Sequence, residues 1–377
     1  MIHIILGTRS EVIKFSSLIG ELQKRNLPFK ILNTGQHGQQ AMIKWIKKLN
    51  LPPPDINTGE SLRMKWSKKG LCTSVPIFGI WATKKIFQLI RIFRKEKPKI
   101  VMYQGDTIMV PLTALAARLS LSKILLVHRE SGMRSHNLLE PLPEEFNRRI
   151  ADKFTDIHFC PTPTAVKNLK EEHAHGEIYY VGDPLIEIVD HILKKFKKPE
   201  EFKKYENFIA VSLHRFENIN NPKKMSNIVK VLEDCPFNLV FPLNLNTRRK
   251  LERYNLLERL KNLDHIYLTD PIAYIDWINL IKDSEGIITD SGGLQEEASI
   301  LKIPCILTRN LTEWKELVDI GASVLTGFDT EKILCYLDDI KNKGEFYQRV
   351  KKAKCPLGDG KATERMVDIL ERCLNEK

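Results

Sequence analysis

The sequence lacks the features that mark secreted, membrane-spanning and zinc-binding proteins. Its seven cysteines are scattered, no two form a C-x-x-C pair, and an odd number argues against a disulfide framework. No apolar run reaches the roughly 20 residues that a membrane-spanning helix needs, because a proline and two lysines interrupt the longest, residues 75–92. No basic flank of a signal peptide precedes the first apolar run. We therefore expect a cytoplasmic protein without a metal site, in which Cys160, Cys305 and Cys335 are buried.

Nucleic-acid-binding motifs are also lacking, although the net charge is +12. The lysines are spread along the chain with acids between them, and basic patches such as residues 194–198 are typical of a solvated helix end or a linker. We expect no nucleic-acid partner. A basic surface would instead attract an anionic sugar nucleotide or lie near an anionic membrane face.

The chain does contain a regular alternation of apolar strand runs and amphipathic helical stretches, which predicts parallel α/β sheets. A length of 377 residues predicts two domains. Strands are predicted at residues 2–6, 29–33, 100–104, 124–128 and 156–160, and in a second series at residues 208–212, 239–242, 266–268, 286–289 and 305–307. The lysine-rich stretch 191–205 separates the series and is predicted to form the interdomain helix and linker. Doubly wound domains place ligand sites at the carboxyl ends of their strands, here facing a common cleft.

The stretch TDSGGLQEE at residues 289–297 carries the most information. It follows an apolar run and opens a helix, which is the layout of a loop that binds a phosphate or diphosphate. Gly292 and Gly293 let the backbone approach the ligand, and Ser291 adds a hydroxyl donor. Glu297, one turn later, is placed to accept hydrogen bonds from a ribose. The alternative is an ordinary strand-to-helix turn with a serine cap.

Cations follow several other predicted strands. Arg9 and Lys14 could both reach a diphosphate, or they could form a basic helix start. In the second series, His214 and Arg215 could bind anionic oxygens, although an ordinary turn histidine would fit the pattern equally well.

Carboxylates stand at two further positions of this kind. Asp106, after the strand at residues 100–104, is either a helix N-cap or an acid/base group. Glu144 opens a helix, where it either stabilises the helix dipole or takes part in chemistry. None of these signals is strong alone, but their order along the chain is specific.

Taken in order, these segments resemble the non-hydrolysing UDP-N-acetylglucosamine 2-epimerase family over nearly the whole chain. The motifs that carry the resemblance are GTRSEVIK at 7–14, TGQH at 34–37, QGDT at 104–107, ESGMRS at 130–135, PEEFNR at 143–148, HRFEN at 214–218, TDSGGLQEE at 289–297 and GDG at 358–360. The resemblance implies a glycosyltransferase-B-like fold: two Rossmann-like doubly wound domains with the active site in the cleft between them. It implies an N-terminal domain of residues 1–185, joined by a C-terminal helix within about 360–377, and a UDP-binding domain of residues 186–359. A homodimer is a further implication.

The family's reaction interconverts UDP-GlcNAc and UDP-ManNAc without NAD or a metal. The proton at C2 of the sugar is not next to a carbonyl, so in the family it leaves as UDP leaves C1, which gives a bound 2-acetamidoglucal. UDP is then re-added with protonation at the opposite face of C2. Inversion therefore needs acid/base groups disposed about the ring and cations that hold the departing diphosphate.

The family's functional residues match positions in both halves of the chain. Asp106, Glu130 and Glu144 match its catalytic carboxylates, and His214 matches a catalytic or diphosphate-contacting histidine. The predicted substrate-binding residues are Arg9, Lys14, Arg134, Arg215, Trp277, Ser291, Gly292, Gly293 and Glu297. Trp277 falls where the family has an aromatic residue against uracil, but it could equally be a core aromatic.

The chain departs from the family pattern at several positions. Arg129 stands where valine is usual, and we expect it either to change the protonation of the neighbouring Glu130 or to point away from the cleft. The other departures are Ser10 for proline, Ser131 for alanine, Phe216 for arginine, Asn244 for histidine, and EWKE at 313–316 for Glu-Arg-Pro-Glu. The last one removes an arginine on the diphosphate side, which Lys315 or Arg309 could replace.

Other functions remain open at this point. One is epimerisation of another UDP-2-acetamido sugar, or a hydrolysing variant that releases the sugar and UDP. A second is a glycosyltransferase, because the fold is shared and does not fix function. A third is a non-catalytic regulator that binds a UDP-sugar without turning it over.

Asn244 and the imperfect glutamine pattern of residues 38–42 predict weak or absent activation by UDP-GlcNAc. In bacterial family members, a histidine stands at the position of Asn244. That histidine and the glutamines that follow the Gln-His pair help to bind a second UDP-GlcNAc. We expect the conversion rate of UDP-ManNAc to change little when UDP-GlcNAc is added. A steep rise in that rate would contradict the prediction.

Overall fold

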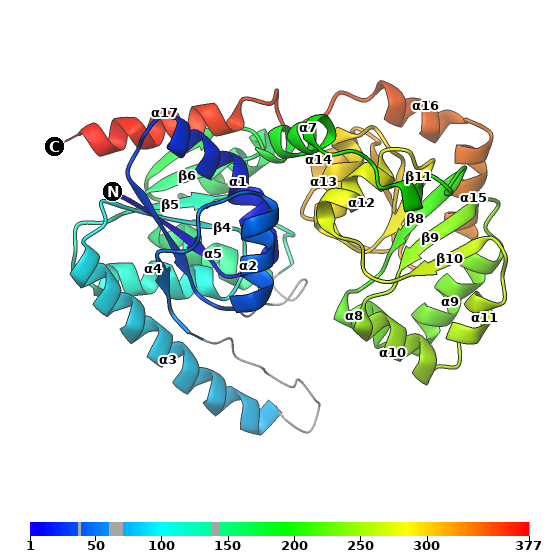
Figure 1. Cartoon of the computed structure of the whole chain (residues 1–377), viewed down its shortest axis with the longest axis horizontal. Coiled ribbons are helices and arrows are strands. Elements are labelled where there is room, and N and C mark those ends of the chain that lie inside the picture. Colours follow the sequence, from blue (N-terminus) through cyan, green and yellow to red (C-terminus); the bar gives the residue numbers. More distant parts are fainter. Residues whose placement is uncertain (37–38, 60–70, 138–142, 377) are drawn as a thin grey trace. The chain divides into compact units, whose positions relative to one another are not determined.

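The computed structural model describes residues 1–36, 39–59, 71–137 and 143–376, and the chain divides into two compact units (Figure 1). The first unit comprises Met1–Ile188 and Gly358–Lys377, and the second comprises Val189–Leu357. His37 and the glutamine pattern of residues 38–42 lie outside the residues whose side chains are described.

The first unit is built on a parallel sheet. Its strands are β1 (Ile2–Leu6), β2 (Phe29–Asn33), β3 (Ile56–Asn57), β4 (Ile100–Gln104), β5 (Leu125–Arg129), β6 (Ile157–Cys160) and β7 (Glu177–Tyr180), in the spatial order β3-β2-β1-β4-β5-β6-β7. Its helices are α1 (Arg9–Lys24), α2 (Gln39–Lys48), α3 (Leu71–Glu96), α4 (Met109–Leu119), α5 (Glu144–Phe154), α6 (Pro163–Glu171) and α17 (Ala362–Asn375). Helix α7 (Leu185–Lys195) contains the boundary between the units.

The second unit repeats this architecture. Its strands are β8 (Phe208–Ser212), β9 (Asn238–Pro242), β10 (Ile266–Thr269), β11 (Gly286–Thr289), β12 (Cys305–Leu307) and β13 (Ser323–Leu325), in the order β10-β9-β8-β11-β12-β13. Its helices are η1 (Glu200–Phe202), α8 (Phe216–Ile219), α9 (Pro222–Glu233), α10 (Leu245–Arg253), α11 (Leu257–Lys261), α12 (Tyr274–Ile281), α13 (Gly292–Ile300), α14 (Lys315–Asp319), α15 (Thr330–Lys341) and α16 (Glu345–Lys352).

Both sheets have the doubly wound order, so the predicted fold class is confirmed. In the first unit, successive strands are added on one side of β1 up to β3 and then, from β4 onward, on its other side. The same reversal of strand order lies between β8 and β11 in the second unit. Ligands of such sheets bind outside the carboxyl ends of the strands at this reversal. The loops after these four strands, together with the helices that follow them, carry most of the predicted site residues.

The last helix returns to the first unit. Helix α17 lies beside α1, where the Thr363 hydroxyl donates to Ser17 Oγ at 3.0 Å and Arg25 Nη1 lies 2.6 Å from Asp368 Oδ1 (Figure 1). The first unit is therefore closed by residues from both ends of the chain.

The cysteines differ in their exposure. Cys160 and Cys305 are buried as predicted, and burial raises the pKa of both thiols. Cys335 is exposed, so the prediction that it is buried was wrong. On α15 the core-facing residues are Ile333 and Leu337, and a helical period of 3.6 places Cys335 between them on the solvent side.

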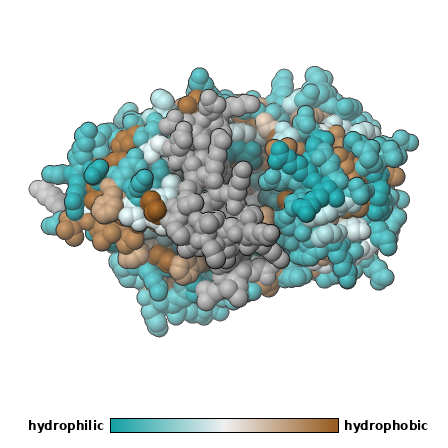
Figure 2. Space-filling view, turned by 90° about the horizontal axis from the view of Figure 1, so that it is seen from below, coloured by the Kyte–Doolittle hydropathy of each residue, from teal (hydrophilic) through white to brown (hydrophobic). Residues whose placement is uncertain are grey.

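The described helices include none with the length and apolar character needed to cross a bilayer. The face of the molecule drawn in Figure 2 is mostly hydrophilic where it is coloured. This agrees with the balance of 28% charged and 42% hydrophobic residues in the chain.

A buried carboxylate holds the loop that follows β5. Asp152 on α5 accepts hydrogen bonds from the Ser131 hydroxyl at 2.5 Å, the Gly132 amide at 3.3 Å and Arg134 Nη2 at 2.7 Å. Its other close neighbour is His128 Nδ1, at 2.6 Å from Oδ1. Although burial acts to raise the pKa of Asp152, the charges of His128 and Arg134 hold this pKa well below its usual range.

His128 extends this contact to the loop after β4. Its Nε2 lies 2.9 Å from the carbonyl oxygen of Gly105, and its Nδ1 faces the Asp152 carboxylate. Both partner oxygens, the Gly105 carbonyl and the Asp152 carboxylate, only accept hydrogen bonds. The loops after β4 and β5 are thus linked through one buried histidine and one buried carboxylate.

A second buried carboxylate links the loop after β1 to the same region. Glu11 Oε2 accepts from the amides of Gly7 at 2.6 Å and Thr8 at 2.9 Å, which forms a capping box at the start of α1. Its Oε1 accepts from the Thr107 hydroxyl at 2.9 Å. Burial raises the pKa of Glu11 to about 7, and these hydrogen bonds oppose the rise.

The raised pKa of Glu11 predicts a pH-dependent stability. Between pH 4.5 and about 7 the unfolded chain releases the Glu11 proton while the folded chain keeps it, so stability falls as the pH rises. Glu11→Gln removes this titration, and its amide can still accept from the two backbone amides and donate to Thr107. From pH 4.5 to 8, wild type should lose on the order of 2–3 kcal/mol relative to Glu11→Gln in urea unfolding.

Glu364→Gln provides the control, because Glu364 is exposed on α17 of the same unit. Its stability should follow that of wild type at every pH. A pH-independent difference between wild type and Glu11→Gln would show that Glu11 is ionised in the folded chain throughout this range.

Replacement of Asp152 tests the buried network. Asp152→Asn removes the charge that compensates buried Arg134 and His128, so it should lower the free energy of unfolding by about 3–5 kcal/mol at pH 7. Asp368→Asn, which breaks an exposed pair with Arg25, should cost less than about 1 kcal/mol. Equal urea midpoints for the two variants would show that Asp152 does not stabilise the fold.

Candidate active site

Glu130 stands at the carboxyl end of β5 in a backbone conformation that non-glycine residues rarely adopt. Its φ is 62°, which lies in the left-handed region. One carboxylate oxygen, Oε1, lies 2.5 Å from Lys14 Nζ and accepts from Gln104 Nε2 at 3.2 Å. The side chains of Lys14 and Glu130 are 12% and 15% exposed. Such a conformation persists only where the surroundings hold it, which is common at functional sites.

The other two predicted carboxylates also lie at the carboxyl ends of the strands of this sheet. Asp106 follows β4, and its side chain pairs with Arg148 of α5 while Asn147 Nδ2 donates to its carbonyl oxygen at 2.8 Å. Glu144 is the first residue of α5 and is half-buried. The N-cap alternative for Asp106 was wrong, because the cap of α4 is Ile108, without a side-chain hydrogen bond.

The loop after β4 also approaches Glu130 directly. A Cβ atom at Gly105 would lie 3.4 Å from Glu130 Oε2. The structure therefore brings the ends of β4 and β5 and the start of α5 together within the first unit.

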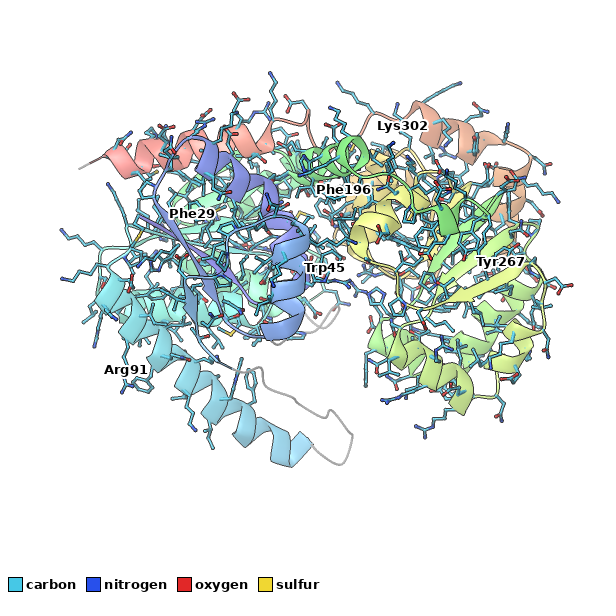
Figure 3. All side chains as sticks on the ribbon, in the orientation of Figure 1. Phe29, Trp45, Arg91, Phe196, Tyr267 and Lys302 are labelled. Carbon is cyan, nitrogen blue, oxygen red and sulfur yellow. The ribbon has the colours of Figure 1, made fainter. Side chains whose placement is uncertain are left out.

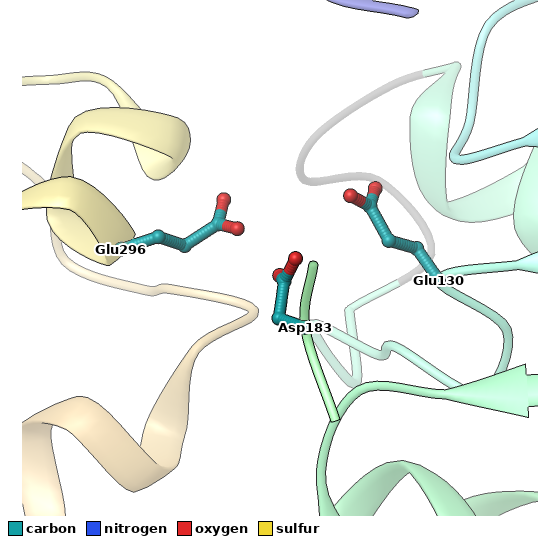
Figure 4. A group of neighbouring side chains, drawn as sticks. All are labelled: Glu130, Asp183 and Glu296. Atoms are coloured by element: carbon teal, nitrogen blue, oxygen red, sulfur yellow. The ribbon is translucent and has the colours of Figure 1, made fainter. Parts of the chain in front are cut away.

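Asp183 adds a carboxylate that sequence reasoning did not select. It is 1% exposed, and one of its oxygens lies within 4.8 Å of a Glu130 carboxylate oxygen (Figure 4). Its Oδ1 accepts from the Leu185 amide at 2.8 Å and lies 3.4 Å from Arg129 Nη2. Arg129 is itself 2% exposed, so its side chain points into the first unit.

Arg9 and Arg134, both predicted to bind substrate, lie in different surroundings. Arg9 is exposed in the first turn of α1, with its guanidinium 5.4 Å from the centre of the Trp45 ring. Trp45 itself lies on α2 and is labelled in Figure 3. Arg134 is buried and pairs with Asp152 and, at 2.8 Å, with Glu172. These partners give Arg134 a structural role that was not predicted, and its contact with substrate stays a prediction.

In the second unit, buried Asp290 holds the loop after β8. It accepts from the backbone amides of His214 at 3.1 Å and Arg215 at 3.0 Å, and from Asn218 Nδ2 at 3.2 Å. The His214 ring lies 3.5 Å from Asp290 Oδ1 and its side chain is 45% exposed. Asp290 directly follows β11, so it joins the two loops at the reversal point of this sheet.

The turn into α13 is a serine-capped helix start. Ser291 caps α13 by accepting from the Leu294 amide at 3.4 Å, which confirms the serine cap and leaves the predicted ligand role untested. A Cβ atom at Gly292 would lie 2.5 Å from Glu313 Oε1, so a larger residue does not fit without movement. Arg309 pairs with Glu313 at 3.0 Å and lies beside Gly292.

Three further predicted positions lie near this turn or on neighbouring elements. Glu297 is buried on α13 and 7% exposed. Lys315 is exposed at the start of α14, so of the two proposed replacements for the missing arginine, Arg309 is the one beside the turn. Trp277 on α12 is half-buried, and its contact with uracil stays a prediction.

Sequence reasoning missed the buried residues that hold these loops. Glu11, Asp152, Asp183 and Asp290 are carboxylates at or near strand ends or on adjoining helices. Asp290 and Glu11 stood within the quoted motifs, and their positions after strands were the available signal. Asp152 lies on α5, and a single carboxylate on a helix gives no sign in the sequence that it is buried.

The chain is similar to known proteins over almost its whole length. A family model described as UDP-N-acetylglucosamine 2-epimerase matches residues 20–371. A UDP-N-acetylglucosamine 2-epimerase of Methanocaldococcus jannaschii is 35% identical over 98% of both chains. A UDP-2,3-diacetamido-2,3-dideoxy-D-glucuronate 2-epimerase of Pseudomonas aeruginosa is 31% identical, again over 98% of both chains.

Solved structures show the same fold. The crystal structure of Methanocaldococcus jannaschii UDP-GlcNAc 2-epimerase in complex with UDP-GlcNAc and UDP matches with a TM-score of 0.83 and 34% identity, covering 98% of this chain and 99% of the other. The match extends over both units. The chain therefore belongs to the UDP-N-acetylglucosamine 2-epimerase family.

Proposed function

We propose that this protein interconverts UDP-GlcNAc and UDP-ManNAc by elimination and re-addition of UDP through 2-acetamidoglucal. The observation that carries the proposal is the placement of Asp106, Glu130 and Glu144 at the carboxyl ends of the strands of the first sheet. Glu130 there is held in a strained conformation against Lys14. Family membership and the relatives' names support the same reaction.

The first unit supplies the acid/base groups in this proposal. One carboxylate takes the C2 proton as the C1–O bond to UDP breaks and its electron pair leaves with UDP. In the return step, UDP attacks C1 while an acid delivers a proton to the other face of C2. Glu130 is the preferred acid/base residue, because the chain fixes both its backbone and its carboxylate. Asp106 and Glu144 are proposed to act with it.

The second unit is proposed to bind the UDP moiety. The amino end of α13, with Ser291, Gly292 and Gly293, offers backbone amides suited to a diphosphate. His214 and Arg215, whose amides Asp290 holds, add polar and cationic groups, and Arg309 is a candidate for the missing arginine. Glu297 is proposed to bind the ribose and Trp277 the uracil.

Epimerisation of another UDP-2-acetamido sugar is the second candidate. The Pseudomonas aeruginosa relative is named for a diacetamido uronate substrate and is nearly as similar to this chain as the named UDP-GlcNAc epimerase. A homodimer, a cytoplasmic location and a role in supplying sugars for polysaccharides or glycoproteins stay predictions.

Proton NMR in deuterated water tests the reaction. Incubation with UDP-GlcNAc should remove the C2 proton signal and produce the manno isomer with UDP still attached. Glu130→Gln should slow this exchange by at least about 100-fold, because loss of a general acid/base group typically costs 10²–10⁴-fold. Glu364→Gln, at an exposed site, should exchange at the wild-type rate.

Each alternative gives a different spectrum. Free sugar and UDP would indicate a hydrolysing enzyme, and transfer to an acceptor without deuterium at C2 would indicate a glycosyltransferase. Exchange only with a different UDP-2-acetamido sugar would move the proposal to that substrate. Near wild-type exchange by Glu130→Gln would reject Glu130 as the acid/base residue.

A further inference from the structure

Arg129 occupies a central position behind Glu130. It is the last residue of β5, and its guanidinium lies 5.8 Å from the centre of the buried Phe15 ring. Its Nη1 donates to Gln104 Oε1 at 2.5 Å and to the Lys14 carbonyl oxygen at 2.6 Å. Its Nη2 lies 3.4 Å from Asp183 Oδ1. One buried cation thus contacts three segments of the first unit.

Two of these partners are the residues that bind the Glu130 carboxylate. Gln104 donates from Nε2 to Glu130 Oε1, and Lys14 Nζ lies 2.5 Å from the same oxygen. An amide side chain can present either its oxygen or its nitrogen to a neighbour. Because Arg129 only donates, it requires the amide oxygen of Gln104 and directs the amide nitrogen toward Glu130.

Arg129 also compensates a carboxylate close to Glu130. Asp183 is 1% exposed and lies within 4.8 Å of Glu130, so two acidic groups share a small region. Burying a charged pair gives little net stability, because desolvation offsets the attraction. Geometric control is therefore a better account of Arg129 than stability alone.

We propose that Arg129 is a positioning residue that fixes the carboxylate of Glu130 through Gln104 and Lys14 and neutralises Asp183 beside it. The inference rests on the proposed function, in which Glu130 transfers the C2 proton. Arg129 does not contact substrate in this role. Its removal should impair the chemical step while leaving UDP binding unchanged.

Arg129→Met tests the role with the full-length protein. We expect kcat for C2 exchange to fall about 10- to 100-fold, since misplacement of a reacting group by about 1 Å can cost 100-fold. KM and the dissociation constant of UDP should stay within about threefold, and Arg129→Lys should recover part of kcat. Arg118→Met is the matched control, because Arg118 also pairs with an aspartate, Asp156, but at 34% exposure and on α4.

Arg118→Met should keep the wild-type kcat and KM. If Arg129→Met does not fold, Arg129→Met combined with Asp183→Asn removes both charges and should fold with the same loss of kcat. A folded single or double variant with kcat within twofold of wild type overturns the proposal. Equal losses of kcat and UDP affinity would also overturn it, because they would indicate a general structural defect.

Failure of the proposed function gives a different result. In that case the wild-type protein itself shows no exchange with any UDP-2-acetamido sugar tested. Crystal structures of wild type and Arg129→Met then test the positioning role directly. The proposal requires Glu130 to leave Gln104 or Lys14 in the variant, and unchanged distances would overturn it.

Discussion

The geometry of the functional loops depends on buried carboxylates that bind the loop backbone. In the first unit, Asp152 accepts from Ser131 and Gly132 directly after Glu130. In the second, Asp290 accepts from the amides of His214 and Arg215. An ionised carboxylate in a buried site has strong demand for donors, so it fixes several loop groups at once. In both units, a buried carboxylate of this kind binds a loop at the carboxyl ends of the parallel strands.

In the first unit, paired charged side chains lie beside Glu130. Arg129 pairs with Asp183, and Lys14 pairs with Glu130. Arg129 is one of the positions at which the chain departs from its family pattern. Arg129 was expected either to change the protonation of Glu130 or to point away from the cleft. In the structure its guanidinium is buried in the first unit, where it contacts Asp183 and Gln104.

Much of the fold could be predicted because buried parallel strands are continuous apolar runs. Strands β1, β4, β8 and β11 begin and end where the runs do. The strands that were missed are β3, β7 and β13, which lie at sheet edges. β7 is only partly buried and β3 has two residues, so neither produces a clear apolar pattern. Cys335 was misjudged because an apolar neighbourhood does not say which face of a helix a residue occupies.

The sequence by itself determined the family, the two doubly wound units and the positions of Asp106, Glu130, Glu144 and His214 after strands or at helix starts. These features depend on hydrophobic periodicity and on short motifs, and both involve residues that are close together in the sequence. Only the tertiary structure decided that Asp152, Asp183 and Asp290 are buried beside the functional loops. Their partners are distant in the chain, as with Asp290 and His214, and hydrogen bonds between distant segments leave no local pattern in the sequence.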